Sequence, residues 1–110
     1  MKKIFTIALL FISLVSVQAA DGSLDALRAK ATEETRVLVQ KVGLNEMEYI
    51  KVKDLIYNKL VAVKEVNEMY GNNPAMRDKK LQAIEEEFNK NLVTTLTPKQ
   101  HRSYLALSNN

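Results

Sequence analysis

Glycine and proline are scarce in this sequence, and their positions divide the chain into segments with helical periodicity. The 110 residues contain three Gly and two Pro. Both residue types disfavour a helix interior, Gly through its backbone entropy and Pro through its missing N–H. Gly43 and the run Gly71-Asn72-Asn73-Pro74 are therefore expected at helix ends. Because no run of alternating apolar and polar residues predicts a strand, we expect an all-α fold.

Apolar residues recur at helical spacing in three long segments and one short one. The first helix is expected between Ser23, as N-cap, and Gly43. The second and third are expected at residues 46–70 and 74–94, and a short fourth helix begins at Thr97. The short connection between the second and third helices predicts a long antiparallel hairpin. The first helix and the short last helix are expected to flank this hairpin.

The apolar stripe of segment 46–70 is broader than the cover that the other segments offer. The third segment presents mainly four large apolar residues, and Thr35 interrupts the stripe of the first segment. Large exposed apolar patches on soluble proteins usually bind something. We therefore expect a homodimer, with a partner surface on the second helix that includes Tyr49, Ile56, Val63 and Met69.

The first residues have the layout of a secretory signal peptide. Two lysines precede an apolar run at residues 4–15, and Val17 and Ala19 stand where a signal peptidase requires small residues. The apolar run is shorter than the roughly 20 residues that span a bilayer. We expect cleavage of residues 1–19 and export of a single helical domain, residues 20–110, to the periplasm or medium. Stable membrane insertion after cleavage is not expected.

Charge and composition argue against several functional classes. Without the two lysines of the predicted signal peptide, 14 basic residues face 13 acidic ones, which gives no sustained basic patch for nucleic acid. The chain has no Cys and one His, His101, so neither an enzyme, a cofactor nor a metal site is expected. The run Glu85-Glu86-Glu87 lies in a helical segment, where consecutive side chains diverge.

Two sequences are typical of helix-capping boxes, at residues 44–48 and 96–100. In the second, the Thr97 hydroxyl can accept from the backbone N–H of Gln100, whose side chain can accept from the N–H of Thr97. In the first, an Asn and a Glu occupy the corresponding positions. Each box is worth about 1 kcal/mol without any ligand. The capping residues, with the Leu that precedes each pair, are Leu44, Asn45, Glu48, Leu96, Thr97 and Gln100.

The run Leu96-Thr97-Pro98-Lys99-Gln100 is similar to the L-T-x-x-Q signature of the Spy/CpxP-like family of small envelope proteins. Leu44-Asn45-Glu46-Met47-Glu48 resembles a diverged first copy, 52 residues earlier. The resemblance extends from Leu44 to the C-terminus and implies a helical hairpin, commonly paired into a dimer, that acts without ATP. Family members hold unfolded envelope proteins, restrain an envelope-stress sensor, or bind metal. The sequence departs from the signature at Asn45 and Glu48, which replace Thr and Gln.

Three classes of function follow from these observations. The first is chaperone-like binding of unfolded or misfolded envelope proteins, and the second is regulation of a signalling protein through its sensor domain. The third is a structural helical module without a client. Met47, Met69 and Met76 either line an adaptable binding surface or fill the core.

Overall fold

The structure, a computed structural model, describes residues 23–108. This part of the chain contains no strand and four helices, namely α2 (Leu24–Val42), α3 (Glu46–Met69), α4 (Pro74–Thr95) and α5 (Pro98–Ser108). The all-helical prediction is confirmed, and the ends expected for α3 and α4 differ from the observed ends by one residue. The predicted signal peptide, residues 1–19, lies outside the described residues.

Polar side chains and a glycine set the limits of α2 and α4. The Ser23 hydroxyl accepts from the N–H of Ala26 at 3.0 Å and caps α2. Gly43 ends α2 at φ 83°, in the left-handed region that favours glycine. Asn73 accepts from the N–H of Met76 at 3.2 Å, directly before the proline that begins α4. These local contacts satisfy backbone groups that a helix end otherwise leaves without partners.

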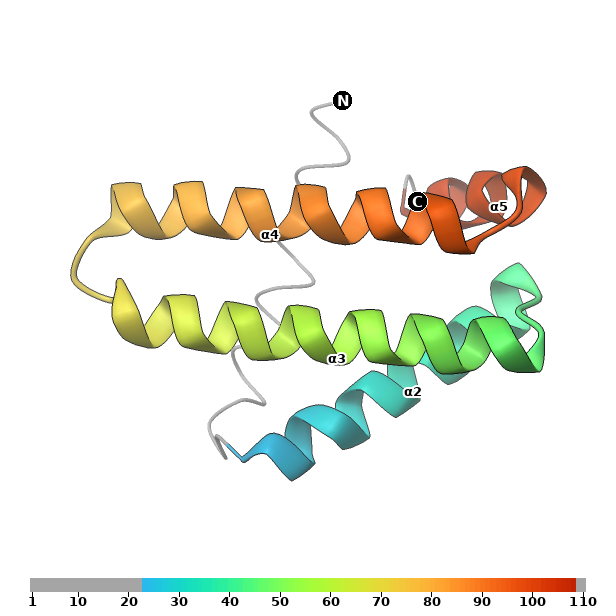
Figure 1. Cartoon of the computed structure of the whole chain (residues 1–110), viewed down its shortest axis with the longest axis horizontal. Helices are drawn as coiled ribbons and strands as arrows, with labels where there is room; N and C mark the ends of the chain where they lie inside the picture. Colours follow the sequence, from blue (N-terminus) through green and yellow to red (C-terminus); the bar gives the residue numbers. More distant parts are fainter. Residues whose placement is uncertain (1–22, 109–110) are drawn as a thin grey trace.

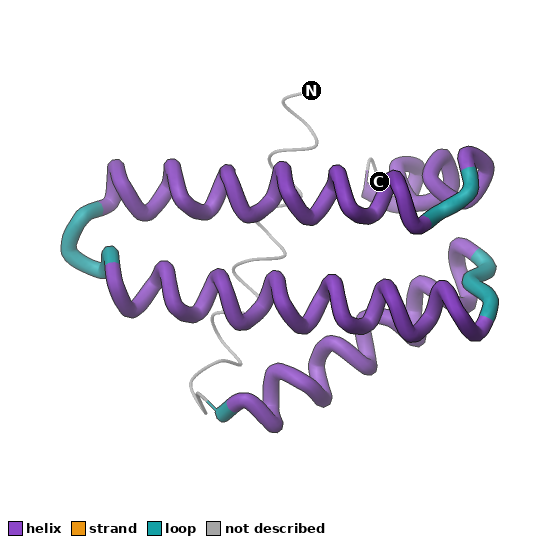
Figure 2. Tube along the Cα trace, viewed as in Figure 1, coloured by secondary structure: helices purple, strands orange, loops and turns teal. Residues whose placement is uncertain are grey.

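Helix α3 lies at the centre of the arrangement and packs against both α2 and α4. Helices α3 and α4 lie side by side and run in opposite directions, while α2 crosses α3 obliquely (Figure 1). Helix α5 folds back at the end of α4 and contacts α2 (Figure 2). The α2–α3 and α4–α5 connections consequently lie at the same end of the molecule, opposite the α3–α4 turn.

The core forms where these helices converge. The α2–α3 and α4–α5 connections contribute to it through Leu44 and Leu96. Its buried members are Leu27, Ala31, Leu44, Val52, Ile56, Leu60, Phe88, Leu92 and Leu96. Thr35 was expected to interrupt the α2 stripe, but it is fully buried. Its hydroxyl donates to the Ala31 carbonyl at 2.6 Å, so the polar group is satisfied within the helix. Thr35 therefore continues the buried face.

Candidate functional site

The first capping box closes the start of α3. The Asn45 side chain accepts from the N–H of Glu48 at 2.8 Å, and the Glu48 carboxylate accepts from the N–H of Asn45 at 2.9 Å. Leu44, directly before the cap, is buried with 9% of its surface exposed. The box thus fixes the entry of the chain into α3 while its leucine anchors the loop in the core.

The second capping box closes the start of α5 in the same way. The Thr97 hydroxyl accepts from the N–H of Gln100 at 3.1 Å, and the Gln100 carbonyl oxygen accepts from the N–H of Thr97 at 2.9 Å. Leu96 is buried with 8% of its surface exposed. The two motifs therefore share both the reciprocal hydrogen bonds and the buried leucine.

The two boxes meet in space through the amide of Gln100. Its Nε2 donates to the Glu48 carboxylate at 2.8 Å and to the Gly43 carbonyl at 3.0 Å. The side-chain amide therefore has partners for its oxygen and for both of its N–H groups. We call the group formed by Gly43, Asn45, Glu48, Thr97 and Gln100 the capping junction. It joins the end of α2, the start of α3 and the start of α5.

Sequence reasoning placed the six capping residues but did not predict that the two boxes bond to each other. A signal for the contact was present in the residue types. Glu48 is an acceptor when ionised, whereas Gln100 both accepts and donates. Two caps of this kind can each close their own helix and still form one bond between them.

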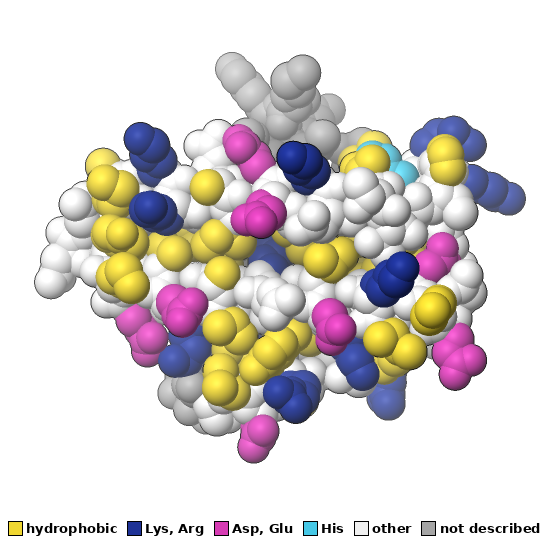
Figure 3. All heavy atoms as spheres, in the orientation of Figure 1, with side chains coloured by type: hydrophobic (Ala, Val, Ile, Leu, Met, Phe, Trp, Pro, Cys, Tyr) yellow, Lys and Arg dark blue, Asp and Glu magenta, His cyan; other side chains and the backbone are white. Residues whose placement is uncertain are grey.

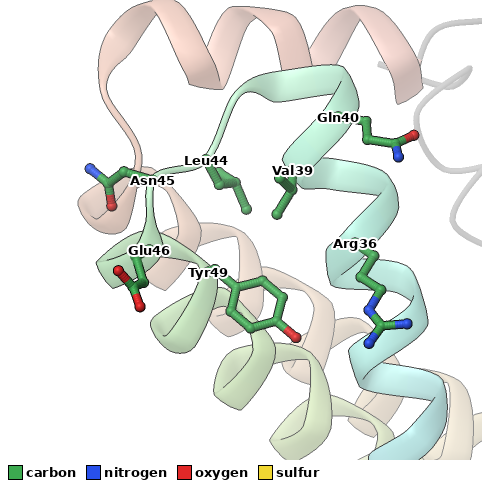
Figure 4. A pocket seen from close by; sticks show the side chains of 7 residues that line it. All are labelled: Arg36, Val39, Gln40, Leu44, Asn45, Glu46 and Tyr49. Carbon is green, nitrogen blue, oxygen red and sulfur yellow. The ribbon is translucent and has the colours of Figure 1, made fainter.

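A hollow opens beside the capping junction, between the C-terminal half of α2 and the first turn of α3 (Figure 4). Its volume is about 420 Å³, and its wall is mostly apolar. The side chains of Val39, Leu44 and Tyr49 converge in it, whereas Gln40 points away. The lining residues are Arg36, Val39, Gln40, Leu44, Asn45, Glu46 and Tyr49.

The structure divides the predicted partner surface of α3 between core and solvent. Ile56 and Val63 are buried with 6% and 5% exposed, because α2 and α4 flank the helix that carries them. This corrects the prediction for these two residues, which are covered within the chain. Tyr49 is half-buried at the hollow, and Met69 is 71% exposed. The four residues therefore do not form one accessible surface.

The three methionines of the described residues all lie on the surface. Met47 and Met69 are 65% and 71% exposed, and Met76 is 38% exposed, so none of them fills the core. Ile50, Val37 and other large apolar side chains are also exposed. Figure 3 shows hydrophobic side chains interspersed with basic and acidic ones on one face of the molecule.

A group of charges lies between the helices. Lys59 of α3 forms an ion pair with Glu85 of α4 at 2.9 Å, and its ammonium lies 4.5 Å from the centre of the Phe88 ring. Glu34 of α2 is half-buried, and its Oε2 atom has no hydrogen-bond partner within residues 23–108. Burial raises the pKa of the Glu34 carboxyl, against the opposing effect of Lys30 and Lys59.

His101 lies half-buried on α5, and residues 23–108 contain no group of three or more His, Asp or Glu that could hold a metal ion. Within the same residues, no helix is both long enough and apolar enough to cross a membrane. The chain matches no protein-family model, no curated protein and no solved structure.

Proposed function

We propose that this chain is an exported Spy/CpxP-like envelope protein that binds unfolded or misfolded envelope proteins without ATP. The observation that carries the proposal is the exposure of Met47, Met69 and Met76. Methionine is flexible and polarisable, so surfaces that accept varied partners often use it. Exposed apolar side chains that alternate with charges suit unfolded segments of mixed composition.

The capping junction also supports the proposal, because it links the two motif copies on which the family resemblance rests. The resemblance rests on two motif copies, and Gln100 of the second copy is hydrogen-bonded to Glu48 of the first. The departure at Glu48 preserves the capping role, because its carboxylate accepts from the N–H of Asn45. A junction in which hydrogen bonds join three helix ends suits a scaffold on which exposed residues bind clients.

The proposal includes self-association of the helical hairpin into a dimer. Since Ile56 and Val63 are covered within the chain, the dimer would form through exposed residues such as Val37 or Val93. Sedimentation velocity of the mature protein at high micromolar concentration tests this step. A compact monomer under those conditions rules out the dimer but leaves client binding to be judged separately.

Aggregation of an unrelated denatured protein tests the main proposal. Stoichiometric mature chain is expected to suppress light scattering without ATP, and the double variant M47Q/M69Q is expected to suppress it less. A double variant of two exposed charged residues, K79Q/K80Q, serves as the control. No suppression by the unmodified chain would defeat the proposal. If the unmodified chain did not suppress aggregation but bound one defined sensor domain, the alternative function, regulation of a signalling protein, would be favoured.

Export is tested by sequencing the N-terminus of the protein in the envelope fraction. The signal-like layout places the cut after Ala19. A mature N-terminus at Ala20 or Asp21 is expected, and an intact Met1 in that fraction would contradict export by a cleaved signal.

A further inference from the structure

We propose that the hollow between α2 and α3 binds an extended peptide by one apolar side chain, with an Asp or Glu of the peptide beside that side chain. This inference rests on the proposed function, because unfolded proteins supply such segments. It adds a defined site and a preference for one chemical class of segment.

The apolar part of the site is formed by Val39, Leu44 and the ring of Tyr49 (Figure 4). The volume of about 420 Å³ lies within the range of roughly 300–1,000 Å³ that is usual for ligand sites. Leu44 is held in place because the adjacent capping box fixes the loop. The floor is therefore formed before any ligand binds, which lowers the entropic cost of binding.

The charged part of the site is Arg36, at the rim of the hollow. No carboxylate within residues 23–108 forms an ion pair with Arg36, so its guanidinium is available to a ligand. A guanidinium presents paired N–H donors that match the two oxygens of a carboxylate. Glu46 lines the opposite wall and repels a carboxylate there, which favours one orientation of the peptide.

An extended peptide suits the surroundings of the hollow better than a compact ligand. Ile50 is 48% exposed and stands four residues after Glu46 on α3, so it shares the face of the helix that borders the hollow. Lys53 lies on the same face, with its ammonium 5.2 Å from the centre of the Tyr49 ring. Apolar and cationic groups thus continue along α3 beyond the hollow.

Fluorescence anisotropy with three labelled Gly-Ser peptides tests this site. One peptide contains Phe-Asp, the second Phe-Lys and the third Ser-Asp. The mature chain is expected to bind the Phe-Asp peptide most tightly. Arg36→Glu is expected to weaken that binding on the order of tenfold, because an attractive pair becomes a repulsive one. The same variant should bind the Phe-Lys peptide more tightly than the unmodified chain does.

Lys79→Glu is the matched control, since it makes the same charge change at an exposed position in the second turn of α4. Equal effects of the two variants, or equal affinity for the Phe-Asp and Ser-Asp peptides, would overturn the inference. A sedimentation change in R36E without a change in peptide affinity would also overturn it, because the occupant would then be a second copy. Suppression of aggregation by unmodified protein, measured in parallel, separates failure of this site from failure of the proposed function.

Discussion

The side-chain amide of Gln100 donates a 2.8 Å hydrogen bond to the carboxylate of Glu48, 52 residues earlier in the chain. Each of these side chains also closes the capping box of its own helix. Glu48 supplies acceptors to two donors, while Gln100 divides its carbonyl and its N–H groups between the two tasks. The bond is charge-assisted, which strengthens it relative to a bond between two neutral amides.

Placing a second carboxylate in this pair should destabilise the fold. Gln100→Glu keeps an acceptor for the N–H of Thr97 but loses the donors to Glu48 and Gly43, and it places two carboxylates together. We expect the free energy of unfolding to fall by about 1–3 kcal/mol, measured by urea denaturation. In the double variant E48Q/Q100E, the new Gln can donate to the new Glu, so the loss should be smaller than the sum of the single losses. Additive losses would show that the two boxes act independently.

Removing either cap should cost stability of similar size. Asn45→Ala and Thr97→Ala each remove a side chain that accepts a backbone N–H at a helix start. We expect losses of about 0.5–2 kcal/mol in urea unfolding. Thr94→Ala is the control, because its hydroxyl donates to a carbonyl in the last turn of α4 and caps no helix start. A control loss as large as the other two would mean that the cap geometry is not responsible.

Gly43 should tolerate Asn better than Ala. Its φ of 83° lies in the left-handed region, and an added Cβ would meet no heavy atom within 4 Å. The penalty for Gly43→Ala is therefore backbone strain without a clash, about 1–2 kcal/mol. Asn adopts this region more readily than Ala, so Gly43→Asn should lose less. Equal thermal midpoints for the two variants would contradict this explanation.

The sequence predicted the helices well because Gly, Pro and the capping residues act locally. Helix limits and reciprocal bonds such as Thr97 with Gln100 depend on neighbours within three or four residues. Which apolar residues become buried depends instead on how the helices pack. Ile56 was expected on a partner surface, yet α2 and α4 flank its helix and it is buried. Thr35 was expected to break the core stripe, but its hydroxyl bonds within its own helix.

Contacts between distant segments were harder to predict for the same reason. The hollow lined by Arg36 and Tyr49 exists because the loop at Gly43 reverses the chain and brings α2 onto α3. Periodicity indicates which residues share a face of one helix, but it does not indicate which residues of two different helices are in contact. The Gln100–Glu48 bond also needs α5 to fold back onto α2, which no local pattern specifies.

The last prediction concerns the pH dependence of stability through Glu34. Burial raises its pKa in the folded state above the ordinary value of 4.5, so the folded chain binds this proton more tightly than the unfolded chain does. The resulting contribution to stability is fully present below the unfolded pKa and is lost as pH rises through the folded pKa. Lys30 and Lys59 oppose the shift but do not cancel it. Glu34 therefore makes the folded chain less stable at neutral pH than at acid pH.

Glu34→Gln should remove this contribution, because the amide stays neutral at every pH. We expect the variant to be more stable than the unmodified chain at pH 7.5, with the difference shrinking as pH falls towards 4.5, by urea unfolding across that range. The other carboxylates are common to both proteins, so the difference between the two curves isolates Glu34. Glu65→Gln, at an exposed position of α3, is the control. Its free energy of unfolding should vary with pH in parallel with that of the unmodified chain. Parallel curves for Glu34→Gln as well would mean that burial does not perturb this carboxyl.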